Sequence, residues 1–521
     1  MNLKLIGLRA LVTSAAALLM VLLGQGLGHA QSAAAIPTAS RPVPLSVPLP
    51  GVPTSPAVAM PAPQLPKAPV PATAAPPPLD WNQVDGEALG YFRTYLRFNT
   101  SNPPGNTVAA INWLKGILEK NGIPVKIYSA QADKPNLVAR LSGPPNVKPL
   151  LLMSHADVVP AVAADWSHPP FAAEIAKGYV WGRGALDDKA HGIMALMTLL
   201  ILKRQHVPLR RGIEMMVNSD EEVGGELGTQ WMVQEHWDAI DPALALNEGG
   251  EGTPNWLGSR GITFKIAVAE KRAMWLRLIA HGRAGHGSEP NDQNPNLILI
   301  RALARLLATQ PPIHLTPTVE ETFSQLAHRF PDPYSTAMAH LGWPMMLDLA
   351  MRGPLAGYAV QALLRDTIAP TMLDAGIKAN VIPSYADATL DCRLLPGADE
   401  QAFLEHLRNR IHDSRVVVEF LQKPAPGDHE SPIQGPFWDA FQDVVTQDFA
   451  GALVVPMLDA GATDSRFLRA RGVAAYGFIP VVLPASEARR IHGIDERLSV
   501  SNLSMGVRTT YDYVKRICAR P

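Results

Sequence analysis

Two neighbouring segments decide the fold: LLLMSHADVVP at residues 150–160 and GYVWGRGALDDKAHG at residues 178–192. The apolar run that opens the first is short enough to be a buried strand of a parallel sheet. His155 and Asp157 follow at its C-terminal end, which is where ligands bind in open α/β sheets. In the second segment, Asp187 and Asp188 follow a Gly-Arg-Gly turn and begin a helix. Each feature alone has an ordinary explanation, a chance His-x-Asp pattern or carboxylates that cap a helix, so their meaning depends on the rest of the chain.

Strands and helices alternate on both sides of these segments. Helical patterns cover residues 80–98, 106–121, 188–204 and 225–237, and strand patterns cover 125–128, 137–141, 212–218 and 243–246. The same alternation resumes near the C-terminus, with helices at 437–449 and 503–518 and a strand at 452–456. This order predicts an α/β fold built on a doubly wound, mostly parallel sheet.

Several predicted strands end in an acidic or imidazole group. His155 follows the strand at 150–153, Glu221 and Glu222 follow 212–218, Glu248 follows 243–246, and Asp187 begins the helix between the first two strands. Because the C-terminal ends of parallel strands share one edge of the sheet, we expect these groups to converge. No run of Lys or Arg accompanies them, so they would repel one another unless a cation holds them together. The alternative is a set of solvated carboxylates at strand ends.

From residue 274 onward the pattern changes to the βαββαβ order of a ferredoxin-like domain. Strands are predicted at 274–282, 378–382, 387–393 and 416–421, and helices at 295–307 and 399–411. A long segment, residues 312–372, separates the two halves, and its prolines should divide it into short helices. These helices would either pack on the inserted domain's own sheet or line a pocket for an apolar acyl or side-chain group.

The N-terminal part of the chain differs from the rest. Lys4 and Arg9 precede an apolar run at 11–23, and small residues follow, which is typical of a secretory signal peptide. The next segment is proline-rich and should be an extended tether without a packed core. The predicted parts are therefore a signal peptide (1–30), a linker (31–78), a catalytic domain in two pieces (79–273 and 422–521) and the inserted domain (274–421) with its helical insertion (312–372). Export to the periplasm or beyond is expected, and an uncleaved membrane anchor is the alternative.

Charge and cysteine content exclude several other classes of protein. The 521 residues carry a net charge of −1, without a basic cluster that would bind nucleic acid. Cys392 and Cys518 are the two cysteines, too few for a disulfide framework and in no metal-binding pattern. The apolar stretches of the helical insertion are interrupted by charges, so no membrane span is expected in the mature chain.

The motifs resemble those of the co-catalytic di-zinc metallopeptidases and amidohydrolases of the carboxypeptidase G, aminoacylase I and vacuolar carboxypeptidase S kind, and most of all the carboxypeptidase S-like branch. The matching stretches are SHADVVP, GRGALDDK, SDEEVGG, NEGG, GHGSEP, KANVIP, LDCR, GATDSRF and IHG, in the family's order. One departure is Glu270-Lys271-Arg272, where carboxypeptidase S-type members tend to have Glu-Lys-Gly. It falls at the entry to the inserted domain and leaves the ligands intact.

The resemblance implies two Zn²⁺ per subunit and assigns residue roles. His155, Glu248 and Asp187 would hold one ion, and His492, Glu222 and Asp187 the other, so that Asp187 bridges them. Glu221 would be the general base, Asp157 would support His155, and the Asp187–Asp188 peptide would be cis. The inserted domain would be a lid and dimerisation domain, with His286 completing an active site, often the partner subunit's. Asn380 and Arg466 would contact the substrate carboxylate, whereas Arg393 could equally form an ordinary ion pair.

These features predict a secreted di-zinc hydrolase that cleaves an amide bond next to a free carboxylate. It would be a carboxypeptidase acting on short peptides or an N-acyl-amino-acid amidohydrolase, and a homodimer through the lid. One alternative is a catalytically silent peptide- or metal-binding protein on the same scaffold, but such a protein has no need of Glu221. Another is a desuccinylase or dipeptidase, and export disfavours the desuccinylase because cell-wall precursors are made in the cytoplasm.

Overall fold

The computed structural model describes residues 78–424 and 429–520. The predicted signal peptide and almost all of the predicted linker lie outside these residues. Among the helices that the model describes, none has both the length and the apolar character that crossing a bilayer requires.

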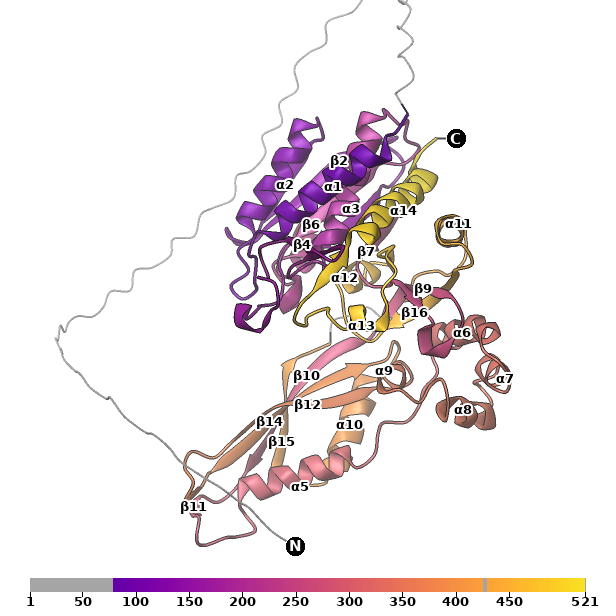
Figure 1. The fold of residues 1–521 in the computed structure, drawn as a ribbon. Helices are drawn as coiled ribbons and strands as arrows, with labels where there is room; N and C mark the ends of the chain where they lie inside the picture. The colour runs from indigo at the N-terminus through magenta and orange to yellow at the C-terminus, as the bar shows by residue number, and fades with distance from the viewer. Residues whose placement is uncertain (1–77, 425–428, 521) are drawn as a thin grey trace, which may run out of the picture. The chain divides into compact units, whose positions relative to one another are not determined.

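The larger sheet is mixed, with parallel strands at its centre (Figure 1). Its order is β1 (Val125–Ser129), β2 (Pro135–Leu141), β6 (Ile213–Asn218), β3 (Leu150–His155), β7 (Leu244–Asn247), β17 (Ala474–Gly477), β9 (Ile262–Glu270) and β16 (Leu453–Asp459). Strands β6, β3, β7 and β17 run parallel, while β1 and β2 pair antiparallel at one end. The α/β fold class is thus confirmed, and β9, next to the edge strand β16, is a strand that the sequence patterns did not reveal.

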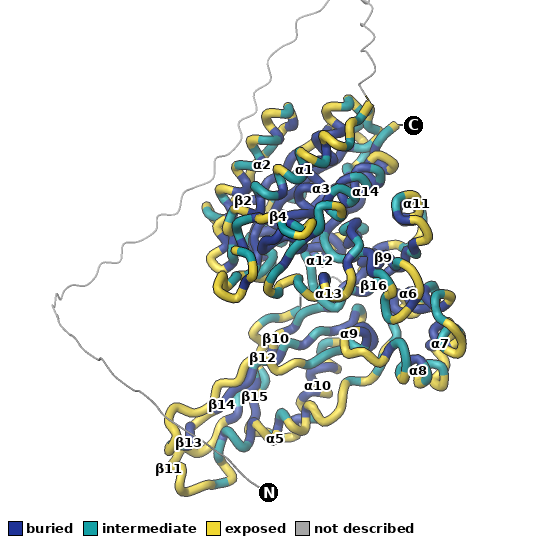
Figure 2. The backbone as a smooth tube through the Cα atoms, in the orientation of Figure 1, coloured by how far each residue is buried: buried dark blue, intermediate teal, exposed yellow. Residues whose placement is uncertain are grey.

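Helices cover both faces of this sheet, as a doubly wound fold requires. Along β3, Leu150 and Leu152 belong to one buried cluster, whereas Leu151 and Met153 belong to another. The first cluster contains side chains of α1 (Trp81–Leu96), α2 (Val108–Lys120), α3 (Lys189–Arg204), α11 (Pro436–Asp448) and α14 (Val500–Cys518). The second contains side chains of α4 (Thr229–Glu235) and α12 (Ser465–Arg469). Helix α3 is buried on nearly all sides because α1 and α14 pack beside it (Figures 1 and 2).

A second, four-stranded antiparallel sheet has the order β12 (Thr367–Ala375), β14 (Tyr385–Leu394), β10 (Arg272–His281) and β15 (Val416–Gln422). Helices α5 (Pro295–Leu307) and α10 (Glu400–Ile411) pack together on it and share its core (Figure 1). The βαββαβ order is as expected, but the second strand is not the one predicted at 378–382. It is β12, which begins inside the segment assigned to the helical insertion and ends beyond it, and 381–382 forms only a two-residue strand, β13, with β11 (Gly285–His286).

The helical insertion forms short helices, as its prolines predict. They are α6 (Pro317–Leu326), α7 (Tyr334–Ala339), α8 (Pro344–Met351) and α9 (Tyr358–Gln361). The expectation that they pack on the second sheet is wrong: Val319, Phe323 and Leu364 join the core of the larger sheet, and α6 packs against β16 (Figure 1). The apolar faces of these helices therefore extend the first core.

Candidate metal centre

Five ligand-type side chains meet at the C-terminal edge of three adjacent strands. His155 is the last residue of β3, Glu222 lies in a 3₁₀ turn (Glu221–Val223) after β6, and Glu248 directly follows β7. Asp187 lies just before α3, and His492 lies in the loop between α13 (Ala485–Ala488) and β18 (Arg497–Ser499). Because β6, β3 and β7 are neighbours in the sheet, residues far apart in the sequence come together here.

The two oxygens of Asp187 face different histidines. Oδ1 lies 2.8 Å from Nε2 of His155, and Oδ2 lies 3.0 Å from Nε2 of His492. Glu248 Oε2 is 3.5 Å from the same His155 nitrogen, and Glu222 Oε2 is 3.1 Å from that of His492. The five residues predicted as ligands thus form two groups that share Asp187, which is the arrangement of a bridging carboxylate.

Asp188 also approaches this cluster, although the sequence did not single it out as a ligand. Its carboxylate, Glu248 and His155 offer ligand atoms that lie within 4.8 Å of one another. Asp188 is fully buried and lies 3.5 Å from Nδ1 of His191. The Asp187–Asp188 peptide is cis, as the resemblance implied.

The electrostatics of the cluster fit a bound cation. Burial raises the pKa of the Glu248 carboxyl well above its usual value, with neighbouring Asp187 adding to the shift. Burial alone would lower the pKa of the His155 imidazole, yet Glu248 and Asp187 raise it well above normal. Hydrogen bonds to Asp187 and Glu222 raise the pKa of His492 to about 10. A cation bound between these carboxylates would stabilise their charged forms. Imidazole nitrogen and carboxylate oxygen are, moreover, ligand atoms that suit a transition metal.

Asp157 supports the cluster in a different way from the one expected. Its carboxylate accepts hydrogen bonds from the backbone N–H groups of Glu221 and Glu222, each at 3.2 Å, and from Nδ2 of Asn102 at 2.8 Å. The ring of His155 donates from Nδ1 to the backbone carbonyl of Asp157 at 2.9 Å, whereas the nearer side-chain oxygen is 3.7 Å away. Asp157 therefore fixes the Glu221–Glu222 turn with its side chain and orients His155 with its carbonyl.

Glu496 is a second supporting carboxylate, which the sequence patterns did not identify. It is fully buried and accepts the backbone N–H groups of Gly184, Leu186 and Asp187, at 3.0, 2.6 and 3.1 Å. Arg183 pairs with it at 2.6 Å. Asn102 and Glu496 lack any recognisable spacing to the ligands, so only the folded chain reveals them.

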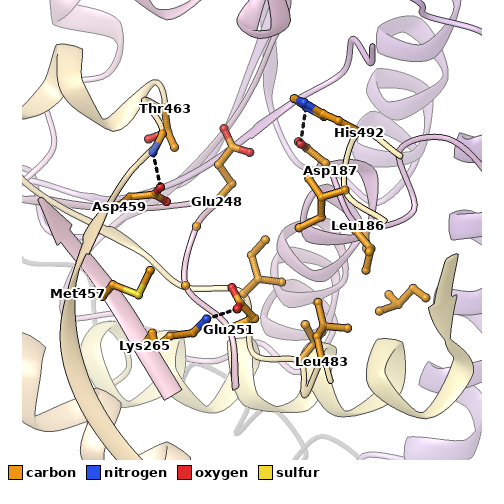
Figure 3. Close-up of a pocket in the computed structure, with 18 of the residues that line it drawn as sticks. Leu186, Asp187, Glu248, Glu251, Lys265, Met457, Asp459, Thr463, Leu483 and His492 are labelled. Carbon is orange, nitrogen blue, oxygen red and sulfur yellow. Dashed lines mark hydrogen bonds and ion pairs between the residues drawn. The ribbon is translucent and has the colours of Figure 1, made fainter. Parts of the chain in front are cut away.

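Two cavities flank the cluster, and both are lined by Glu221 and His492. The first, here called the apolar cavity, has a volume of about 380 Å³ and lies within the larger-sheet region (Figure 3). Its walls are mostly aliphatic, with the carboxylate of Asp459 among them, and the aliphatic side chains are those of Ala185, Leu186, Ala190, Met457, Ile479, Val481, Leu483 and Leu498. Burial raises the pKa of the Glu221 carboxyl well above its usual value, and the charge of Glu248 raises it further.

The second cavity, here called the cationic cavity, has a volume of about 200 Å³. Its basic lining residues are Lys271, Arg272, Arg393 and Arg466. Arg393 forms an ion pair with Asp391 at 2.8 Å, and Arg272 forms one with Glu400 at 3.1 Å. Arg466 instead donates to two backbone carbonyls, those of Thr463 and Gly224, at 2.6 and 2.8 Å. Arg393 and Arg466 were both expected at the substrate. Within the described residues, only Arg393 of these two forms a hydrogen bond to a carboxylate.

Two predicted site residues do not lie at the cluster of this chain. His286 is exposed in β11, where its ring contacts Ser288 Oγ at 2.6 Å. Asn380 is also exposed, and its carbonyl accepts the Gly287 N–H at 2.8 Å. Neither residue lines the apolar or the cationic cavity.

An α/β sheet with imidazole and carboxylate side chains grouped at its C-terminal edge is typical of a metal-dependent hydrolase. The chain belongs to peptidase family M20/M25/M40, whose model matches residues 151–516. The human N-fatty-acyl-amino acid synthase/hydrolase PM20D1 is 32% identical over 383 residues, which cover 71% of this chain and 74% of that protein. A probable carboxypeptidase S-like 2 of Dictyostelium discoideum is 31% identical over 387 residues, 71% of this chain and 72% of that one.

The fold is also that of a solved member of the family. The M20 family metallo-carboxypeptidase Sso-CP2 from Sulfolobus solfataricus superposes with a TM-score of 0.64 at 18% identity, covering 82% of this chain and 98% of that one. The resemblance found in the motifs is confirmed, and the chain is a metal-dependent hydrolase of amide bonds.

Proposed function

We propose that this protein hydrolyses the amide bond of N-acyl amino acids that carry a free carboxylate, using two zinc ions per subunit. The observation that carries the proposal is the pair of cavities that share Glu221 and His492, because one is largely aliphatic and the other contains several cations. An amide at the ligand cluster would have its acyl group in the apolar cavity and its carboxylate in the cationic one. The name of the human relative, an N-fatty-acyl-amino acid synthase/hydrolase, favours an N-acyl amino acid, whereas that of the carboxypeptidase S-like relative fits a peptide.

In this proposal His155, Glu248 and Asp187 hold one zinc ion, and His492, Glu222 and Asp187 hold the other. When bound, the ions would polarise the scissile carbonyl. They would also lower the pKa of water, so that it can lose a proton near neutral pH and become a better nucleophile. Glu221 takes a proton from the attacking water and delivers it to the leaving nitrogen.

The other predicted residues act on the substrate or on these groups. Arg466 binds the substrate carboxylate with its guanidinium group, and Asp157 holds the Glu221–Glu222 turn in place. Arg393 takes part less directly because Asp391 already neutralises it. Secretion of the enzyme is part of the proposal and rests on the signal-peptide pattern at residues 1–30.

A substrate panel tests the proposed function. We expect the zinc-loaded protein to release the amino acid from N-acyl amino acids with a higher kcat/KM than from dipeptides of similar size. The amino acid amides of the same acyl compounds should react poorly, because they lack the carboxylate. Equal rates for acid and amide substrates would contradict the proposed role of the cationic cavity.

We also propose that residues 274–421 form a lid that pairs two subunits, and that His286 and Asn380 act in the neighbour's site. Both residues are exposed and away from the cluster of their own chain. Mixing His286→Ala with Glu221→Gln protein should therefore restore activity, since one heterodimer site would have both residues. We expect up to half of the wild-type activity per heterodimer after subunit exchange, measured as kcat per active site.

The controls for this experiment are each variant incubated alone under the same exchange conditions, and both should remain inactive. Exchange itself can be followed with differently tagged subunits. A mixture in which heterodimers form without any recovered activity would show that His286 does not act across the interface.

A further inference from the structure

An ion pair lies at the far end of the apolar cavity. Lys265, on β9, contacts the carboxylate of Glu251, which follows Glu248 by three residues in the loop after β7. Both residues line the cavity, and the Lys265 side chain is only 9% exposed. Figure 3 shows this pair on the opposite side of the cavity from Asp187 and His492, with Leu186 and Leu483 along one side and Met457 on the other.

The pair is held in place by its surroundings. The Thr253 hydroxyl donates to Glu251 Oε1 at 3.3 Å, and Nζ of Lys265 lies 5.5 Å from the centre of the Trp256 ring. The loop that carries Glu251 contains Gly249 and Gly250, both with positive φ. A Cβ on Gly250 would lie 2.3 Å from the backbone oxygen of Lys265, so the loop needs glycine there to approach β9.

These contacts decide what the cavity can accept. An acyl chain that enters from the ligand cluster passes Leu186 and Leu483 on one side, and Met457 with the carboxylate of Asp459 on the other, before it reaches Lys265 and Glu251. Further methylene groups would have to displace or desolvate the paired charges of Lys265 and Glu251. This costs free energy, because an apolar chain offers these charges no new hydrogen bond or ion pair. The same mutual pairing leaves little reason for the two charges to bind a polar group at the end of the chain.

We propose that the Lys265–Glu251 pair sets the maximum length of the acyl chain, so that the substrates are N-acyl amino acids with an apolar acyl group of limited length. Lys265 and Glu251 are thus specificity-determining residues. This inference rests on the proposed function, because it places the acyl group in the apolar cavity.

Binding rather than turnover provides the test, so that it does not depend on catalysis. Zinc-loaded Glu221→Gln protein is titrated by calorimetry with N-acylglycines from acetyl to hexadecanoyl, each below its micelle concentration. The dissociation constant should fall by up to about fourfold per added methylene while the chain still enters aliphatic surroundings. Beyond one length it should stop falling or rise, and that length is the break point.

Two sets of variants in this background move the break point in opposite directions. Lys265→Ala with Glu251→Ala removes both charges and opens space, so the break should shift to longer chains. Met457→Trp narrows the cavity and should shift the break to shorter chains, and it does so without disturbing the ion pair. The matched control is Lys148→Ala with Asp241→Ala, an exposed ion pair of 2.7 Å outside the apolar cavity, which should leave the break unchanged.

Each outcome distinguishes the length limit from the function. A break that stays in place in the Lys265→Ala/Glu251→Ala protein overturns the inference, even if N-acyl amino acids are hydrolysed. A gain in affinity for acyl chains that end in a carboxylate or hydroxyl would also overturn it, since the pair would then recognise a polar end. A break that moves as expected supports it, and does so even if wild-type protein fails to hydrolyse these compounds, in which case the proposed function alone is wrong.

Discussion

Replacing Glu221 by glutamine should lower kcat by about 10²- to 10⁴-fold while the metal content of the protein stays unchanged. Glutamine has nearly the same shape but cannot accept and release a proton at neutral pH. Glu221 lines both cavities, so it lies where an amide between them would be cleaved. The measurements are kcat, with saturating substrate, and metal per subunit by elemental analysis.

Two neighbouring glutamates provide the controls for this variant. Glu226→Gln removes an exposed carboxylate five residues along the chain and should behave like the wild type. Glu222→Gln should lose metal as well as activity, because its carboxylate faces His492. Glu221→Gln protein with full turnover at full metal content would remove Glu221 from the proton transfer.

Replacing Arg466 by methionine should reduce kcat/KM for substrates with a free carboxylate by about 10- to 100-fold, since one hydrogen bond between charged groups contributes about 1.5–3 kcal/mol. Much of the loss should disappear when the substrate carboxylate is replaced by an amide. The ratio of kcat/KM for acid and amide substrates is therefore the quantity to measure. A general disturbance of the Gly224 turn, which Arg466 also contacts, would lower both values and leave the ratio unchanged.

Arg471 offers a matched control for Arg466. It too donates to a backbone carbonyl, that of Val233 at 2.8 Å, and lies over an aromatic ring, that of Trp237, but it does not line the cationic cavity. Arg471→Met should leave the acid-to-amide ratio at the wild-type value. If both arginine variants change the ratio equally, the carboxylate is not bound by Arg466.

The convergence of three of the five side chains could be predicted from the sequence because these residues follow strands directly. His155, Glu222 and Glu248 each come at or just after the end of a strand, so the strand order brings them together. Asn102 and Glu496 could not be predicted in this way. They reach the cluster from a loop and from the segment before β18, and their roles arise from backbone hydrogen bonds that carry no sequence pattern.

The misplaced strand and the misplaced helices have separate physical causes. Pro370 lies within β12, and proline inside an apolar run argues against a strand unless the strand lies at an edge, which is where β12 lies. For α6–α9, apolar residues that recur every three or four positions indicate that one face of each helix is buried. They do not indicate which of two sheets covers that face, and in this protein it is the larger one.

The anchoring of α6–α9 also affects how the second sheet can move. A domain inserted in the simplest way is joined to its host by two chain segments, but here the chain passes between the two cores four times, at β9–β10, α5–α6, α9–β12 and β15–α11. Lys271 connects the β9–β10 and α9–β12 crossings by hydrogen bonds. Its Nζ donates to the carbonyls of Ala362 and Arg365 and to the hydroxyl of Thr367. A hinge needs a few residues that are free to rotate, and four crossings, two of them connected through Lys271, restrict such rotation. We therefore expect any opening of the second sheet to be a small movement rather than a free rotation.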